Sequence, residues 1–272
     1  MIRVRIKEKE IAFSIWPIVI VLIVLFLIFY KGGAISYNEL YDEVINSIES
    51  GETDVDISRH ATDSTIKKVG YRIINGSPEY FHIVNSYSYS SNDKNSWTFS
   101  FSYNSYADNY EKNLVRYREM VKEIASQVDE TYTDYEKALW LHDYMIDNFS
   151  YDYNYSSYSS LSMLDNKKGI CSSYALLYKD LLEEVGIKNE IVIGKTEGGY
   201  GPTYKLGLHC WNIVKIGRFW YHIDTTWDDT LEGRYTYFMV SDSYMKKHYH
   251  YSWFCVDGKK HYCWFNKNDN LN

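Results

Sequence analysis

The stretch LHCWNIVKIGRFWYHID, residues 208–224, is the strongest indication of the fold. It is typical of two strands joined by a tight turn at Gly217 and Arg218. A two-residue hairpin loop with glycine first favours a type II′ turn. Such a turn pairs Ile216 with Phe219 and thereby sets the register of both strands.

The predicted register places His209 and Asp224 on one face of this hairpin. Counting back from the turn pairs His209 with Thr226 and Trp211 with Asp224, so His209 and Asp224 are diagonal neighbours within reach of a hydrogen bond. A loop one residue longer would put them on opposite faces. Cys210 points the other way, and we expect it to pack behind the site, neither a ligand nor a nucleophile. The residues predicted to share the face of His209 are Trp211, Ile213, Trp220, His222 and Asp224.

A further reactive side chain, Cys171, lies upstream in GICSSYALLYKDLLEEVG. Apolar residues at helical spacing predict a helix that ends before Gly186. Cys171 falls in the first turn of that helix and in phase with its apolar stripe, so it faces the body of the protein. Unpaired N–H groups and the helix dipole favour a thiolate at this position. A buried structural cysteine is the alternative. The stripe consists of Tyr174, Ala175, Tyr178, Leu181, Leu182 and Val185.

These three residues suit nucleophilic catalysis. A thiolate nucleophile needs a base, and the base needs a group that orients it. We therefore predict that Cys171 attacks, that His209 carries its proton and that Asp224 fixes the imidazole.

Three segments resemble the transglutaminase-like superfamily of bacteria: EKALWLHDYMIDNFSYD, GICSSYALLYKDLLEEVGI and HCWNIVKIGRFWYHIDTTWDD. The similarity covers about residues 132–253. It implies a papain-like core, in which a helix bearing the nucleophile packs on an antiparallel sheet, and it implies that no cofactor is needed. By this resemblance Cys171, His209 and Asp224 are the triad residues.

The chain departs from papain-like enzymes in its oxyanion hole. Those enzymes use a glutamine a few residues before the cysteine, and MLDNKKGI contains none. We expect the backbone N–H of Cys171 to serve first. The Asn166 amide and the Trp211 indole N–H are weaker candidates, and Tyr174 is a weak candidate for binding substrate.

The order of elements, helices first and then sheet, indicates an α+β fold. We expect a catalytic domain at residues 131–272 and, before it, a helix-plus-hairpin extension at residues 36–130. The capping box SYNE at residue 36 opens an amphipathic helix. Alternating aromatic residues within residues 80–103 predict two strands joined by the loop SNDKNS.

Residues 11–30 carry no charge over 20 positions. A helix of that length crosses a hydrocarbon core of about 30 Å. Basic residues precede it and acidic residues follow it, which predicts a cytoplasmic tail at residues 1–10 and an extracytoplasmic remainder. A cleaved signal peptide is the alternative. We therefore expect a single-pass anchor in the cell membrane.

Charge and residue spacing argue against nucleic-acid and metal partners and leave the pairing of the cysteines undecided. The formal charge of −7 argues against nucleic-acid binding. The spacing of His248, His250 and His261 fits no known set of metal ligands, so we predict no metal site. Cys255 and Cys263 form a disulfide only if a five-residue loop opposes them, whereas a tight Asp-Gly turn would separate them.

His142 lies on the apolar face of the helix that begins with TDYE, and we expect a core histidine with satisfied hydrogen bonds. For the whole chain we predict an extracytoplasmic thiol enzyme that acts on peptide or carboxamide bonds through a thioester. Hydrolysis is favoured over cross-linking because no second, barrel-like domain follows. Cell-wall or surface peptides are the expected substrates. The alternative is a catalytically silent module of the envelope that binds peptide or glycan.

Overall fold

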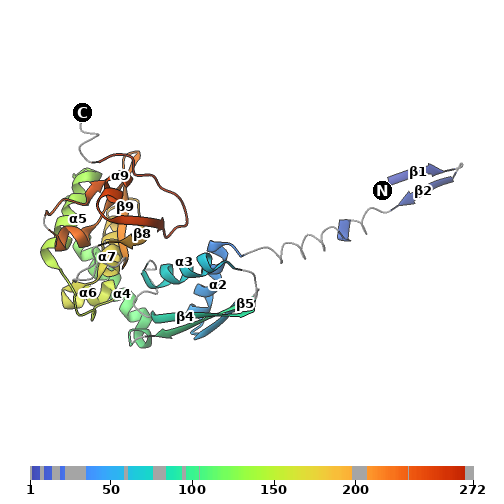
Figure 1. Ribbon diagram of the computed structural model, residues 1–272, viewed down its shortest axis with the longest axis horizontal. Helices are drawn as coiled ribbons and strands as arrows, with labels where there is room; N and C mark the ends of the chain where they lie inside the picture. Colours follow the sequence, from blue (N-terminus) through green and yellow to red (C-terminus); the bar gives the residue numbers. More distant parts are fainter. Residues whose placement is uncertain are drawn as a thin grey trace. The chain divides into compact units, whose positions relative to one another are not determined.

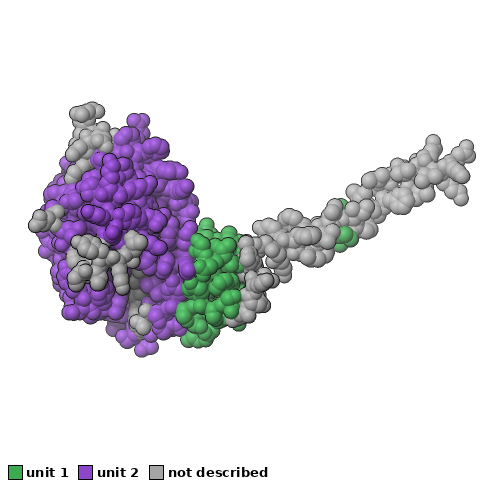
Figure 2. Space-filling view, viewed as in Figure 1, with its two compact units in different colours: residues 1–66, 88–100 green, residues 67–87, 101–272 purple. Residues whose placement is uncertain are grey.

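The computed structural model of the 272-residue chain forms two compact units, residues 1–66 with 88–100, and residues 67–87 with 101–272 (Figure 1; Figure 2). The predicted division between residues 130 and 131 stays a prediction. The structure describes residues 2–6, 9–13, 19–21, 35–57, 61–75, 84–93, 96–103, 105–197, 207–231 and 233–266.

The predicted membrane-spanning helix at residues 11–30 lies mostly outside the described residues. Of it, residues 11–13 belong to strand β2 (Lys9–Phe13), which pairs with β1 (Ile2–Ile6), and residues 19–21 are helical. Within the described ranges, no helix has the length and apolar character that a membrane crossing requires. The anchor therefore stays a prediction.

The elements of the N-terminal extension agree with the predicted helix and hairpin. Helix α2 (Tyr37–Glu49) begins with the predicted capping box at Ser36. Strands β3 (Asp54–Ile57), β4 (Val84–Asp93) and β5 (Ser96–Tyr103) form a sheet in the order β3-β5-β4. Both hairpin strands run into the segment SNDKNS that was predicted as their loop. Helix α3 (Asp63–Asn75) was not predicted.

A helical core surrounds α7 (Cys171–Glu184), the helix predicted to carry the nucleophile. Its Tyr174, Tyr178 and Leu181 side chains are fully buried. The other helices before the sheet are η1 (Ala107–Asn109), α4 (Tyr110–Ala125), α5 (Asp134–Asn148) and α6 (Ser160–Asn166), and the short strands β6 (Ser150–Tyr151) and β7 (Lys168–Gly169) pair in parallel.

The central sheet is antiparallel and packs against α7 (Figure 1). Its order is β11-β10-β9-β8-β12. Its strands are β8 (Asn189–Thr196), β9 (Gly207–Ile216), β10 (Phe219–Ile223), β11 (Phe238–Val240) and β12 (His250–Cys255). Helices α8 (Thr225–Thr230) and α9 (Asp242–Lys247) follow β10 and β11. The predicted α+β class is confirmed.

The register predicted for the hairpin of β9 and β10 is confirmed. Ile216 pairs with Phe219, so the loop has two residues. Gly217 has φ of 56°, as a type II′ turn requires of its first central residue. Cys210 lies in the cluster under α7, whereas Trp211 lies in the cluster on the opposite face of the sheet.

The second strand of the hairpin ends earlier than the sequence suggested. It was expected to pair as far as Thr226 but stops at Ile223, because the Asp224 carboxylate accepts the Trp227 N–H and caps α8. Cys255 and Cys263 do not oppose each other across a hairpin, because β12 pairs with β8 and residues 256–266 form no strand.

Candidate active site

Cys171 is the first residue of α7 and is half-buried. The first N–H groups of a helix have no partner within it, and here the preceding Ile170 offers no polar side chain to cap them. The helix dipole adds a positive end at the same place, which stabilises a negative charge on sulfur. The Cys171 side chain packs against the buried cluster that contains Cys210.

His209 and Asp224 meet as the predicted register requires. His209 Nε2 lies 2.6 Å from Asp224 Oδ2, and both side chains are buried. The other carboxylate oxygen, Oδ1, accepts the Trp227 N–H at 3.0 Å. Because this second bond starts a helix, the carboxylate is held from both sides and has little freedom to turn.

The charges of this pair stabilise each other. Burial lowers the pKa of His209, but the charge and hydrogen bond of Asp224, with a further contribution from Cys171, raise it to about 10. Burial raises the pKa of Asp224, but the charge and hydrogen bond of His209 hold it well below its usual range. The structure therefore favours an imidazolium beside an ionised carboxylate.

Cys171 is correspondingly acidic. A hydrogen bond from the Cys210 thiol lowers the pKa of Cys171 most, burial opposes this, and the hydrogen bond and charge of His209 lower it further. The net pKa lies well below that of an ordinary cysteine. At neutral pH this arrangement favours a thiolate and imidazolium pair.

Cys210 is a buried packing residue, as predicted, but it lies closer to the nucleophile than the sequence suggested. It faces α7, and the first residue of α7 is Cys171. The Cys210 thiol and its backbone N–H both act on the Cys171 sulfur and lower its pKa. The same contact, and then burial, raise the pKa of Cys210 well above its usual value, so it stays a neutral donor.

Two of the weaker candidates, Trp211 for the oxyanion hole and Tyr174 for binding substrate, have their polar groups engaged elsewhere. Trp211 has a single N–H and donates it to His222 Nδ1 at 2.9 Å, so none is left for an oxyanion. The Tyr174 hydroxyl donates to Asp229 Oδ2 at 2.6 Å, and its side chain is fully buried. Tyr174 is therefore part of the core.

Asn166 is exposed at the end of α6, and its amide donates to Ser157 Oγ at 3.0 Å. That bond draws the amide toward the loop before α6. The backbone N–H of Cys171 remains the first candidate for an oxyanion donor.

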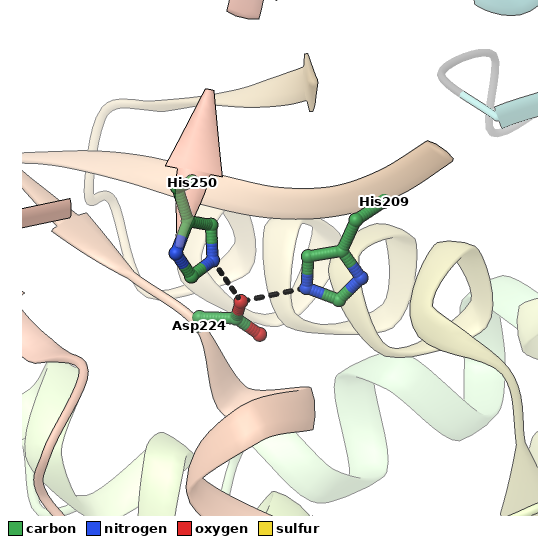
Figure 3. Close-up of side chains that lie close together, drawn as sticks. All are labelled: His209, Asp224 and His250. Atoms are coloured by element: carbon green, nitrogen blue, oxygen red, sulfur yellow. Dashed lines mark hydrogen bonds and ion pairs between the residues drawn. The ribbon is translucent and has the colours of Figure 1, made fainter. Parts of the chain in front are cut away.

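Sequence reasoning missed His250 as part of this site. Its Nε2 lies 3.2 Å from Asp224 Oδ2, so two imidazoles flank one carboxylate oxygen (Figure 3). The sequence signal was the segment KHYH, whose histidines were weighed only as metal ligands. Tyr71 of α3 was also missed, and it packs against the cluster that Cys171 contacts.

His142 is confirmed as a core histidine with satisfied hydrogen bonds. It is fully buried, with Nε2 3.0 Å from Asp228 Oδ2 and Nδ1 3.2 Å from Asp143 Oδ1. Burial lowers the pKa of His142, but these two carboxylates raise it above its usual value. Burial raises the pKa of Asp228 to about 6.

The four cysteines are free thiols. Cys255 and Cys263 pack in the same hydrophobic cluster, but no bond joins them, so the possible disulfide is not present. Burial raises the pKa of Cys255 to about 12. It also raises the pKa of Cys263 well above its usual value, so both thiols stay protonated at neutral pH.

Three groups within the described part of the chain bring possible metal-binding atoms within 4.8 Å of one another. Each group contains a histidine hydrogen-bonded to a carboxylate, and that bond accounts for the closeness without an ion. The prediction that no metal is needed stays a prediction. The groups are His209 with Asp224 and His250, His222 with Asp242 and Cys263, and Cys255 with Asp257 and His261.

Comparison with solved structures gives distant similarities. One protein, described as "a TGase", has a TM-score of 0.36 and 14% identity, over 64% of this chain and 50% of its own. A "Putative Cysteine Protease" from Cytophaga hutchinsonii has a TM-score of 0.35 and 11% identity, over 68% and 84%. A "putative protease" from Parabacteroides distasonis ATCC 8503 has a TM-score of 0.31 and 15% identity, over 54% and 36%. This chain thus spans half the length of the protein described as "a TGase".

The sequence comparisons identify a family pattern in part of the chain. No curated protein matches this chain. Residues 118–225 match the profile of the Transglutaminase-like superfamily. The segment from α4 to the start of α8, which carries Cys171, His209 and Asp224, thus has the sequence pattern of the transglutaminase-like superfamily.

Proposed function

We propose that this protein is a thiol enzyme in which Cys171 attacks the carbonyl carbon of a peptide or carboxamide. The observation that carries the proposal is the 2.6 Å hydrogen bond between His209 Nε2 and Asp224 Oδ2. It leaves the other ring nitrogen, Nδ1, to exchange a proton with Cys171, whose acidity His209 increases. The nucleophile contacts the proton carrier, and the proton carrier contacts the group that orients it.

In the first step the Cys171 thiolate forms a bond to the carbonyl carbon, and the carbonyl oxygen becomes an oxyanion. The backbone N–H of Cys171, at the positive end of α7, is the donor proposed to stabilise it. As the tetrahedral intermediate collapses, the C–N bond breaks and the His209 imidazolium gives its proton to the leaving amine. A thioester on Cys171 and a neutral imidazole remain.

In the second step water or an amine attacks the thioester carbon. Neutral His209 takes a proton from the attacking group, and the C–S bond then breaks to return the thiolate and imidazolium pair. Water yields hydrolysis and an amine yields a cross-link. We propose hydrolysis as the main outcome, with cell-wall or surface peptides as substrates and residues 11–30 as a membrane anchor.

The proposal is tested by alkylating the full chain with iodoacetamide across a range of pH and mapping the modified cysteines. We expect Cys171 to react rapidly near and below neutral pH, because its thiolate persists there. In His209→Ala the rate at neutral pH should fall toward that of an unperturbed thiol. Buried Cys255, followed in the same digests, is the internal control.

A different result would contradict the catalytic interpretation. If Cys171 in the unaltered protein reacts no faster than a free thiol with a pKa of about 8.5, it is not an activated nucleophile. That outcome would favour a module that binds peptide or glycan without catalysis.

A further inference from the structure

His250 occupies a place that the three proposed catalytic residues do not explain. It is the first residue of β12, is fully buried, and points Nε2 at the carboxylate oxygen that also receives His209 (Figure 3). The Asp224 carboxylate therefore has three nitrogen partners: His209, His250 and the Trp227 N–H. Burying a polar side chain this deeply costs free energy unless its hydrogen bonds are made.

The hydrogen bonds of His250 determine its protonation. Nδ1 lies 2.9 Å from the backbone carbonyl oxygen of His248. A carbonyl oxygen only accepts, so Nδ1 carries a proton. Nε2 faces an ionised carboxylate oxygen, which also only accepts, so Nε2 carries a second proton. Both ring nitrogens therefore face acceptors, and only an imidazolium has a proton for each of them.

The surroundings of His250 favour a cation. The ring centroid of Trp227 lies 4.3 Å from that of His250, that of Trp211 lies 4.9 Å away with the two rings at 77°, and that of Tyr237 lies 5.4 Å away. Aromatic rings attract a cation through their electron-rich faces, and more strongly where water is excluded.

The titratable groups that face His250 come from several elements around it. His209 comes from β9, and Asp224 caps α8. His222, from β10, accepts the Trp211 indole N–H on Nδ1 and donates Nε2–H to Asp242, so it is neutral. Burial raises the pKa of Tyr237 above its usual range, so its hydroxyl keeps its proton.

We propose that His250 is a fourth member of the site, a positioning residue whose two ring protons hold Asp224 and balance its charge. The inference rests on the proposed function of Cys171. Charges then alternate from the Cys171 thiolate to the His209 imidazolium, the Asp224 carboxylate and the His250 imidazolium. Their sum is zero, whereas the first three alone would leave a buried net negative charge.

This arrangement has a consequence for Cys171. Without His250, the uncompensated charge of Asp224 disfavours a second anion nearby. The Cys171 thiolate should then form only at higher pH. His250 thus keeps the nucleophile ionised at lower pH without touching a substrate.

The test measures the pH dependence of Cys171 alkylation in the full chain for His250→Phe and His250→Gln. Phenylalanine keeps a ring and removes both donors. Glutamine can still donate one N–H to Asp224 but carries no charge. We expect both variants to move the alkylation midpoint to higher pH, with the rate below the midpoint lowered about tenfold for each unit of that shift. Because glutamine retains a hydrogen bond, its melting temperature should stay closer to that of the unaltered protein.

His261→Gln is the matched control. It makes the same change to another histidine hydrogen-bonded to a carboxylate, Asp257, at 2.9 Å. We expect its alkylation profile to coincide with that of the unaltered protein.

A second measurement does not depend on variants that fold. Nitrogen-15 NMR of the histidine rings in the unaltered protein should show His250 with both nitrogens protonated at neutral pH. One unprotonated nitrogen on His250, or an unchanged alkylation profile in a folded His250 variant, would overturn the inference. Failure of the proposed function gives a different result, since Cys171 would then react like an ordinary thiol before His250 is altered.

Discussion

Two neighbouring residues on β9 act on the same sulfur from different directions. His209 contributes a positive charge and a hydrogen bond to Cys171, and Cys210 contributes hydrogen bonds from its thiol and its backbone N–H. Strand alternation sends their side chains to opposite faces of the sheet. Both reach Cys171 because it stands at the end of a helix, where its sulfur is open to neighbours from more than one side.

At the residue scale we expect Cys210→Ala to raise the pKa of Cys171, because the largest contribution to its acidity is the hydrogen bond from the Cys210 thiol. The measurement is the midpoint of the pH profile for Cys171 alkylation, which should move to higher pH. Cys255→Ala is the matched control, since it removes a buried thiol that lies in a different cluster. A midpoint that does not move in Cys210→Ala would show that its thiol leaves the nucleophile unaffected.

At the element scale, the end of β10 determines how the site is held. A continued strand would have left Asp224 Oδ1 without the Trp227 N–H as a partner. Instead its carboxylate caps α8 through the Trp227 N–H. The residue proposed to orient His209 is thereby also a helix cap, and each role restricts the other's freedom.

The turn between β9 and β10 provides the prediction at this scale. Gly217→Ala should lower the free energy of unfolding by about 1–2 kcal/mol, because an alanine at φ of 56° is strained. Gly207→Ala is the control: both glycines have open space where a Cβ would stand, but of the two only Gly217 has a positive φ. Equal losses in the two variants, measured by urea unfolding, would contradict the assigned turn.

At the scale of the whole molecule, a buried hydrogen bond joins the helical core to α8, the helix that Asp224 caps. His142 of α5 bonds Asp228 of α8, and Asp228 also accepts the Tyr237 N–H at 2.7 Å. These hydrogen bonds hold α8, and with it Asp224, against α5 of the helical core.

We expect His142→Phe to lower the free energy of unfolding by about 3 kcal/mol, because it leaves the Asp228 carboxylate buried without its imidazole partner. Adding Asp228→Asn should recover part of the loss, since the amide removes the charge and still accepts the Tyr237 N–H. Denaturant unfolding of both variants makes the comparison. A loss below about 1 kcal/mol in His142→Phe, or no recovery in the double variant, would argue against a stabilising role for this hydrogen bond.

Local sequence patterns were enough to predict the hairpin register, the placement of Cys171 at a helix start, and the meeting of His209 with Asp224. Each follows from a local rule: a two-residue turn, a period of 3.6 or an alternation of 2. The partners of these residues depended on tertiary packing. Only the fold brought Cys210 under the first turn of α7 and His250 to Asp224, because helix docking and strand pairing across distant segments have no local signal.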